Sequence, residues 1–337
     1  MKKSKKNEAP NKLFDLAIGY QSAKVLFALI ELEIPSLLAQ HKISLEQLAK
    51  RLKIEIIAVD RLLNSAVALG LLEKKAGNFR NAPVTARFLV KTAPDYLGEQ
   101  FLRYDDSSYP LWSDLVNKLR EWKLNATDES EPEADDQGGN SMAAQHNYAV
   151  LVGRALGENF DFSGFKRLLD LGGGTGAMSI GIGGVHKHLS ATVFDLPQVA
   201  KVAKEFVKES NLSERIKVET GNFKEDDLPD NFDVALLANL LSVASEKTNR
   251  ELFRRIYEKL PVGGAIILSG WILDNSRTSP LIPVLFCLED VARAAPDVER
   301  TAATYTAWLK DAGFKKIRRK MFFEPSSMIV ARKNQPD

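Results

Sequence analysis

The feature that most constrains this chain is a short apolar strand that runs directly into a glycine-rich turn. The strand, expected over 167–171, contains three leucines, and the turn follows as Gly172-Gly173-Gly174-Thr175-Gly176. Glycine has no Cβ, so backbone N–H groups in such a turn can approach a ligand closely. Gly172, Gly174 and Ala177 also satisfy the dinucleotide-binding spacing, with alanine in the third place. The turn therefore predicts a nucleotide-like cofactor without identifying it.

Two acidic residues narrow the choice of cofactor. Asp170 lies two positions before the first glycine, and Asp195 ends the next expected strand, 191–195. An acid at the tip of the second strand suits ribose hydroxyls. A second acid beneath the glycine turn suits an ammonium group, which S-adenosylmethionine has and NAD lacks. The two positions together favour S-adenosylmethionine.

Composition limits the general class of protein. The chain has 337 residues, enough for two domains that each bury a core, and a net charge of +2 that indicates neither nucleic acid nor an acidic membrane surface as a partner. Cys287 is the single cysteine, which excludes an internal disulfide framework and a cysteine-based metal cluster. No apolar run was expected to reach the ~20 residues of a membrane span. We expect a cytoplasmic protein with no membrane and no nucleic-acid partner.

Residues 1–124 have the pattern of a winged-helix domain. Two helices meet near Pro35, Ser44 and Gln47 form a capping box, and a helix over about 56–69 precedes two short strands at 71–74 and 78–81. Such domains often bind DNA, but the second helix carries only Arg61 as a basic group, too little for phosphate neutralisation and base readout. We expect dimerisation and covering of the substrate instead.

The rest of the N-terminal part is helical and aromatic. Residues 84–122 contain seven aromatic side chains that we expect mostly in a core, although Tyr104 and Tyr109 could reach a substrate pocket. Residues 125–141 are acidic, include a Gly138-Gly139 pair and lack apolar periodicity. We interpret them as a flexible connection.

Residues 142–337 alternate strands and helices, which predicts a doubly wound, largely parallel α/β sheet with a Rossmann-like arrangement. Its ligand should lie at the carboxyl ends of the strands. Two final segments, 315–323 and 328–332, should form a closing hairpin around Pro325-Ser326. Seven strands with a reversed last pair favour a methyltransferase over a dehydrogenase.

Over nearly its whole length the sequence resembles the S-adenosylmethionine-dependent O-methyltransferases of the caffeate and acetylserotonin type. The motifs that carry this resemblance are Leu69-Gly70-Leu71-Leu72, Phe162-Ser163-Gly164-Phe165, Asp170 to Gly176, Phe194-Asp195-Leu196-Pro197, Leu260-Pro261-Val262-Gly263-Gly264, Trp308-Leu309 and Ala312-Gly313-Phe314. The resemblance implies a homodimer through the N-terminal domains and a small-molecule acceptor. It also implies that the glycine turn holds the methionine end of the cofactor, Asp195 the ribose, and Gly221-Asn222-Phe223 the adenine.

The departures from the family concern catalysis. Counting back from Leu260-Pro261, the family's His-Asp-Trp motif falls on Ser242-Val243-Ala244, and the glutamate that orients its histidine falls on Gly270. Only the glutamate of the later Glu-Arg-Thr match survives, as Glu299. The usual proton-abstracting pair is therefore missing, which matters for a phenol acceptor of pKa ~10 but not for a thioether.

Three hypotheses remain open for the chemistry. The first is methylation of a nucleophile that needs no base, favouring a thioether or thiol acid as in dimethylsulfoniopropionate synthesis. Arg293, one turn after Glu289, would hold the acceptor's carboxylate, unless the two residues pair with each other. The second keeps O-methylation with His146 as a relocated base, with Gln145 and Asn147 as equally plausible cofactor contacts. The third is an S-adenosylmethionine-binding enzyme that transfers no methyl group, as in hydroxylation or rearrangement.

The candidate site residues fall into three groups. We expect His146 and Glu299 in catalysis, and Tyr104, Tyr109, Glu289, Arg293 and Trp271 around the acceptor. The cofactor contacts are expected to be Asp170, Gly172, Gly174, Gly176, Asp195, Leu196, Asn222, Phe223 and Asn239. No metal ligands are expected.

Overall fold

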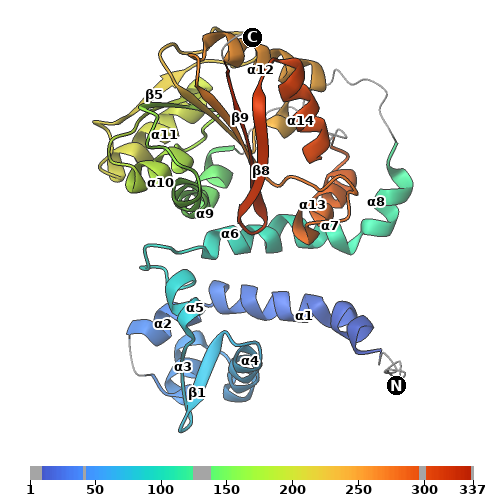
Figure 1. Ribbon diagram of the computed structural model, residues 1–337. Helices are drawn as coiled ribbons and strands as arrows, with labels where there is room; N and C mark the ends of the chain where they lie inside the picture. Colours follow the sequence, from blue (N-terminus) through green and yellow to red (C-terminus); the bar gives the residue numbers. More distant parts are fainter. Residues whose placement is uncertain (1–9, 41–42, 124–137, 296–300, 335–337) are drawn as a thin grey trace, which may run out of the picture. The chain divides into compact units, whose positions relative to one another are not determined.

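The computed structural model of the protein describes residues 10–40, 43–123, 138–295 and 301–334 (Figure 1). The chain divides into two compact units, Met1–Tyr109 and Pro110–Asp337. This division falls earlier than the boundary expected at residue 124. The expected acidic connection 125–141 lies largely outside the described residues, except that its last positions already belong to helix α9, Gly138–Asn159, which starts before the expected Met142.

The first unit contains helices and a small two-stranded sheet. Its elements are α1 (Asn11–Glu31), α2 (Ile34–Gln40), α3 (Leu45–Leu52), α4 (Ile56–Ala68), β1 (Leu72–Lys75), β2 (Asn78–Asn81), α5 (Pro83–Phe88), α6 (Gly98–Arg103) and the π-helix η1 (Tyr104–Ser108). The predicted capping box is confirmed: Gln47 N–H donates to Ser44 Oγ at 3.2 Å, and Ser44 N–H donates to Gln47 Oε1 at 2.9 Å. Two helices followed by a hairpin therefore form in the expected order.

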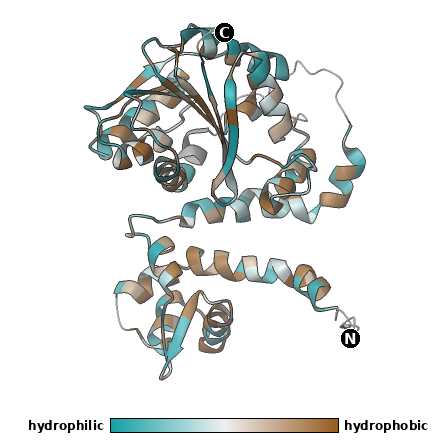
Figure 2. Ribbon diagram, in the orientation of Figure 1, coloured by the Kyte–Doolittle hydropathy of each residue, from teal (hydrophilic) through white to brown (hydrophobic). Residues whose placement is uncertain are grey.

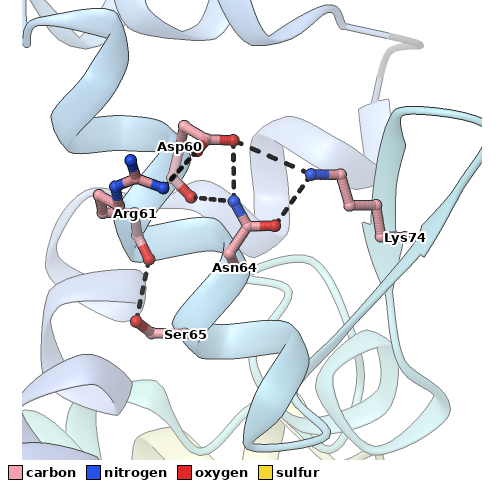
Figure 3. A network of polar contacts seen from close by, with 5 residues as sticks. All are labelled: Asp60, Arg61, Asn64, Ser65 and Lys74. Carbon is pink, nitrogen blue, oxygen red and sulfur yellow. Dashed lines mark hydrogen bonds and ion pairs between the residues drawn. The ribbon is translucent and has the colours of Figure 1, made fainter.

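Helix α4 carries a small polar network on the side that faces β1 (Figure 3). Asn64 Nδ2 donates to Asp60 Oδ1 at 2.8 Å, and Lys74 of β1 donates to Asn64 Oδ1 at 2.9 Å. Arg61 lies 3.6 Å from the Asp60 carboxylate in an ion pair. Arg61 and Lys74 thus contact the acid and amide of this helix, which is in line with the prediction that α4 does not read DNA. That exclusion stays a prediction.

Helix α1 is rich in apolar residues (Figure 2), and several of them are exposed. Leu13 and Leu16, near the start of the helix, are 69% and 70% exposed. By length and composition alone α1 could cross a membrane, and only 17% of its most apolar window is buried. The expectation that no apolar run reaches this length was therefore wrong, although Lys24 within it pairs with Asp105 at 2.7 Å.

The aromatic side chains of 84–122 also differ from expectation. Phe88, Tyr96, Phe101, Tyr104, Tyr109, Trp112 and Trp122 are each partly buried, and none lies in a fully buried core. The segment is not one amphipathic helix but a series of short ones, ending with α7 (Tyr109–Ser113) and α8 (Leu115–Glu121). Short helices leave their side chains accessible for contacts beyond a single core.

The second unit is built on one seven-stranded sheet. After α9 come β3 (Arg167–Leu171), α10 (Ala177–Val185), β4 (Ser190–Asp195), α11 (Pro197–Glu209), β5 (Ile216–Thr220), β6 (Val234–Ala238), the short 3₁₀-helix η2 (Leu241–Val243), α12 (Glu246–Lys259), β7 (Ala265–Gly270), α13 (Leu281–Ala292), α14 (Ala302–Asp311), β8 (Lys315–Phe323) and β9 (Ser326–Arg332). The expected alternation is confirmed, with boundaries shifted by one to a few residues.

The strand order is β5-β4-β3-β6-β7-β9-β8. Strands β3 to β7 pair in parallel, whereas β9 is antiparallel to both β7 and β8. At this edge of the sheet the last two strands stand in reversed order, β9 before β8, which confirms the expected reversed last pair. In direction, only β9 runs against the other strands of the sheet. The order switches direction between β3 and β6, and a ligand site is expected outside the strand ends at such a switch point.

Helices cover both faces of the sheet (Figure 1). Alternate strand residues form two cores: Leu169, Leu171 and Leu237 pack with α12 and α14, while Leu168, Val234 and Leu236 pack with α9, α10 and α11. A strand exposes successive side chains to opposite faces, so strands buried on both sides are apolar throughout. This rigid frame fixes the carboxyl ends of β3, β4, β6 and β7 relative to one another.

Candidate active site

The turn after β3 is held in a conformation that other residues would resist. Gly172, Gly174 and Gly176 have φ of 63°, 56° and 73°, in the left-handed region. Space is also limiting, because a Cβ at Gly173 would lie 2.9 Å from Asp170 Cγ, and one at Gly172 would lie 2.4 Å from Leu240 Cδ1. The turn thus packs directly on Leu240, two residues after the end of β6, a contact that the sequence alone did not suggest.

Asp195, at the end of β4, is bound to this turn. Its Oδ2 accepts the N–H of Gly174 and its Oδ1 accepts the N–H of Leu196, both at 2.8 Å. Burial raises the pKa of this carboxyl, while the two backbone hydrogen bonds lower it. Each carboxylate oxygen retains acceptor capacity, so Asp195 can bind hydroxyl groups while it positions the turn.

Asp170 lies beneath the turn with no exposed surface. Ser179 of α10 donates to its Oδ2 at 2.7 Å, but Oδ1 has no partner in the part of the chain that the structure describes. Burial raises the pKa of Asp170 to about 6; the Ser179 hydroxyl lowers it, and the charge of Asp195 contributes to the rise. An unpaired buried carboxylate oxygen is costly unless a cation or donor completes it.

The residues after β5 lie next to Asp195 at the carboxyl ends of the parallel strands. Gly221 N–H donates to the Asp195 carbonyl at 3.0 Å, and a Cβ at Gly221 would lie 2.2 Å from Phe194 Cζ. Asn222 Oδ1 accepts the N–H of Lys224 at 3.1 Å, so one of its lone pairs is used within the turn. Phe223 packs against the core shared with α12 and α14. The predicted adenine contacts of Asn222 and Phe223 stay predictions.

Side chains of α7 and α13 meet around a buried carboxylate. Glu289, 5% exposed, accepts a hydrogen bond from Trp112 Nε1 at 2.8 Å and pairs with Arg293 at 2.6 Å. The structure therefore has the Glu289–Arg293 pairing that was left open as the alternative to a free Arg293. Trp271, directly after β7, packs edge-on against Phe286 of α13, with ring centroids 4.2 Å apart. These rings form an apolar wall beside the carboxyl end of β7.

Comparison with known proteins identifies the family. The model of the O-methyltransferase domain matches residues 120–315, and that of the O-methyltransferase dimerisation domain matches residues 14–91. The chain belongs to the S-adenosylmethionine-dependent O-methyltransferases. The 3-hydroxy-5-methyl-1-naphthoate 3-O-methyltransferase of Streptomyces sahachiroi is 31% identical over 325 residues, covering 94% of this chain and 93% of that relative.

Two further comparisons span the whole chain. The N,N-dimethyltransferase OxyT of Streptomyces rimosus is 30% identical and covers 90% of both sequences. The crystal structure of human N-acetylserotonin methyltransferase in complex with SAM matches with a TM-score of 0.83 at 27% identity, covering 99% of this chain and all of that one. The predicted family, the α/β fold with a helical dimerisation domain, and the S-adenosylmethionine cofactor are confirmed.

The carboxyl edge fits this cofactor on its own geometry. Asp170 Oδ1 is an acceptor that lacks a partner, and an ammonium group is the partner that its charge would favour. Gly173 packs so closely on Asp170 that a Cβ there would clash with the carboxyl group, so no side chain at this position can cover the acid. Asp170 and the glycine turn would hold the methionine end of the cofactor, and Asp195 would hold its ribose. The expected cofactor contacts of Gly172, Gly174, Gly176 and Leu196 stay predictions.

In this O-methyltransferase, the positions that match the family's catalytic histidine and glutamate lie near the ends of β6 and β7. Ser242 is in η2, immediately after β6, and Gly270 is the buried last residue of β7. Asn249 holds the η2 turn by donating to the carbonyls of Leu241 and Ala244 at 2.9 and 3.1 Å. These two positions thus carry the Ser242 hydroxyl and a glycine without a side chain, and neither residue can act as a base at neutral pH.

His146 of α9 lies against the glycine turn. Its Nδ1 is 2.8 Å from Thr175 Oγ1, and its ring stacks on Phe206 of α11 with centroids 3.8 Å apart. Burial lowers the pKa of His146 to about 4. A base of so low a pKa is weak near neutral pH, which argues for a packing role, although its catalytic role remains a hypothesis.

Replacing His146 with alanine is expected to lower stability more than it changes the pH profile of turnover. Loss of the stacked, hydrogen-bonded ring should cost about 2–4 kcal/mol of unfolding free energy, as for other buried aromatic truncations. The ratio of variant to natural rate should be constant between about pH 6 and 8, because a group of pKa about 4 does not titrate there. His188→Ala, an exposed histidine, is the control. If turnover rises with pH in this range in the natural protein and in His188→Ala but not in His146→Ala, His146 is the base.

Three further expected site residues stay predictions. Glu299 lies outside the described residues, so its catalytic assignment stays a prediction. Tyr104 and Tyr109 belong to the first unit, where Lys24 lies 5.0 Å from the centroid of the Tyr109 ring. Sequence reasoning missed Leu240, Thr175, Ser179 and Trp112. Their spacing carries no chemical signature, and only the fold brings them to the site.

Proposed function

We propose that this chain methylates a small acceptor by positioning its nucleophilic atom, without a dedicated histidine base. The observation that carries the proposal is the identity of the residues at the base positions, Ser242 and Gly270. When bound, S-adenosylmethionine supplies an electrophilic methyl group on a positively charged sulfur. Well-oriented, desolvated reactants can gain about 7–11 kcal/mol from proximity alone, so positioning is a sufficient source of rate.

The nucleophile that best suits such a site has no proton to lose. A phenol near pKa ~10 is largely protonated at neutral pH and gains about 10²–10⁴-fold from a positioned base. A thioether sulfur instead donates its lone pair to form the new S–CH₃ bond, while the old bond to the methyl group breaks with its electron pair. The products are a sulfonium and S-adenosylhomocysteine, and no proton moves. A thiolate reacts in the same way to give a neutral thioether.

Two observations bear on the acceptor class. The named relatives methylate oxygen, as in the naphthoate 3-O-methyltransferase, and nitrogen, as in OxyT, so the family scaffold accommodates more than one nucleophile. The aromatic wall of Trp271 and Phe286 offers ring edges and faces, which make favourable contacts with sulfur. We therefore favour a small thioether or thiol acid, with a hydroxyl acceptor as the alternative suggested by the relatives' names.

The test is a comparison of two acceptors across pH. The protein is incubated with S-adenosylmethionine and either 3-(methylsulfanyl)propanoate or 4-hydroxybenzoate, and S-adenosylhomocysteine is quantified by chromatography. The thioether acid should react at a rate that is flat between about pH 6 and 9, and the phenol should react slowly, with a rate that rises about tenfold per pH unit. Efficient phenol methylation near neutral pH, without any sulfur methylation, would overturn the proposal.

We also propose that the protein is a homodimer through its first unit. The dimerisation-domain match covers most of α1, whose Leu13, Phe14 and Leu16 are at least 64% exposed in the single chain. Burying each leucine would contribute about 1.5–3 kcal/mol, and an apolar helix left in water would be a liability.

Placing charges on α1 is expected to separate the dimer. The double variant Leu13→Glu/Leu16→Glu should halve the molar mass measured by light scattering, because two buried carboxylates cannot be accommodated in an apolar contact. Val262→Glu, at an exposed apolar position of the second unit, is the matched control and should leave the mass unchanged. An unaltered mass for the double variant would exclude α1 from the dimer contact.

A further inference from the structure

Asn239 stands at the carboxyl end of β6 in an uncommon conformation. Its φ is 53°, in the left-handed region, and its N–H donates to the Ser269 carbonyl of β7 at 2.8 Å. Asparagine tolerates this region better than most residues. The side chain is exposed, and its carboxamide makes no hydrogen bond to any residue that the structure describes. The backbone is therefore fixed, while the amide remains available to a ligand.

Gly270 provides the space that this carboxamide occupies. A Cβ at Gly270 would lie 2.7 Å from Asn239 Oδ1, closer than real contacts allow. Any larger side chain at position 270 would have to displace the amide. Gly270 therefore replaces the family's glutamate and also leaves the space in which the Asn239 side chain turns toward β7. With Oδ1 facing Gly270, the amino group is the donor on the other side of the carboxamide.

The segment that carries this carboxamide also contacts the cofactor turn. Leu240, the next residue, is the side chain that Gly172 packs against, and β6 lies between β3 and β7 in the sheet. Ser242 follows in η2, and its hydroxyl likewise makes no hydrogen bond within the described ranges. Asn249 rigidifies this segment through the carbonyls of Leu241 and Ala244. Two neutral hydrogen-bonding groups are thus carried by a segment whose backbone Asn249 holds and whose Leu240 side chain contacts Gly172.

We infer that Asn239, which the sequence analysis assigned to the cofactor, instead positions the methyl acceptor by donating a hydrogen bond to a carboxylate or carbonyl oxygen of that acceptor, in the space vacated by the family's glutamate. This inference rests on the proposed function, because an amide can orient a nucleophile but cannot deprotonate it. The carboxylate-binding role first considered for Arg293 passes to Asn239, because Arg293 pairs with the buried Glu289. A neutral donor also avoids repelling the positively charged sulfonium product.

Two variants of Asn239 separate this role from a structural one. Asn239→Gly removes the amide and suits the left-handed backbone, and Asn239→Asp keeps the shape but replaces the donor with a negative charge. The acceptors are 3-(methylsulfanyl)propanoate and its uncharged analogue 3-(methylsulfanyl)propan-1-ol. For the acid, KM should rise about tenfold in the glycine variant and about a hundredfold in the aspartate variant, whereas KM for the alcohol should change little. Equal effects on both acceptors would overturn the inference.

Binding measurements keep the test independent of turnover. Calorimetry should show unchanged affinity of both variants for S-adenosylhomocysteine; a parallel loss would make Asn239 a cofactor contact and overturn the inference. Nuclear magnetic resonance should detect 3-(methylsulfanyl)propanoate binding to the natural protein with S-adenosylhomocysteine and not to Asn239→Asp. Failure of the natural protein to bind it would also overturn the inference. Binding without methylation would instead contradict the proposed function alone.

A double-mutant cycle tests the contact with Gly270. Gly270→Ala should raise KM for the acid about as much as Asn239→Gly, because the new methyl group displaces the carboxamide. Combining the two changes should add nothing to either one, since both remove the same interaction. Asn231→Asp is the matched control: Asn231 is another exposed, left-handed asparagine that precedes β6, with φ of 63°. Additive effects of the two variants would refute the proposed contact.

Discussion

Asp195→Ala is expected to weaken the binding of S-adenosylhomocysteine by about a hundredfold or more. The change would remove the acceptor that we expect for two ribose hydroxyls, and each hydrogen bond to a charged group contributes about 1.5–3 kcal/mol. It also removes the bonds from Gly174 and Leu196 that hold the glycine turn against β4. Both effects act in the same direction, and calorimetry of the natural protein and the variant measures their sum.

Two further variants separate these contributions to cofactor affinity. Asp195→Asn keeps one acceptor oxygen and should weaken binding by less than alanine does. Asp161 accepts the N–H of Ser163 at 2.9 Å, away from the strand ends, so Asp161→Ala is the control and should leave the affinity unchanged. Thermal unfolding reports whether the turn has collapsed. Unchanged affinity in a folded Asp195→Ala protein would remove the assignment of Asp195 to the ribose.

The alternation of strands and helices was predictable because the buried strands of the sheet have a recognisable sequence pattern. Leu168-Leu169 and Val234 to Leu237 are continuously apolar, as expected for strands covered on both faces, and glycines or acids mark their ends. Helix α1 was misjudged for a physical reason. Its apolar side chains include both the contacts of Phe27 and Ile30 within the unit and the exposed Leu13 and Leu16. Spacing alone cannot say which partner an apolar residue packs against.

The candidate site divides along a similar line. Asp170, Asp195 and the glycines were predictable because cofactor binding requires particular groups at strand ends, and strand ends can be found in the sequence. The pairing of Glu289 with Trp112 joins residues far apart in the chain, and the contact of Leu240 with Gly172 depends on strand order. The burial of His146 against Phe206 likewise depends on how α9 and α11 pack. Such contacts follow from the tertiary structure, which no local pattern encodes.

Cofactor affinity is expected to depend on pH through Asp170. In the free protein, burial raises the pKa of Asp170 to about 6. A ligand ammonium beside Oδ1 would stabilise the carboxylate and lower that pKa, so binding at acidic pH must expel a proton. The affinity for S-adenosylhomocysteine should therefore fall about tenfold for each pH unit below about 6 and be constant between about pH 6 and the loss of the ligand's own ammonium proton near pH ~8.

The same linkage fixes the sign of the effect on folding. The pKa of Asp170 is higher in the folded protein than in the unfolded chain, where a carboxyl titrates near ~3.9. Between these values the folded state binds more protons, so the stability of the free protein should fall as the pH rises from about 4 through about 6. Bound S-adenosylhomocysteine should reverse this loss, because it supplies the positive charge that the buried carboxylate lacks.

Asp170→Asn is expected to abolish both dependences and to weaken binding by about a hundredfold, since the ammonium then faces a neutral amide of the same shape. Calorimetry in buffers of different ionisation enthalpy counts the protons released, which should approach one near pH 5 for the natural protein and zero for the variant. Asp233→Asn is the control, because Asp233 binds the N–H groups of Lys166 and Arg167 at the opposite edge of the sheet. Proton release that survives in Asp170→Asn would show that another group faces the ligand ammonium.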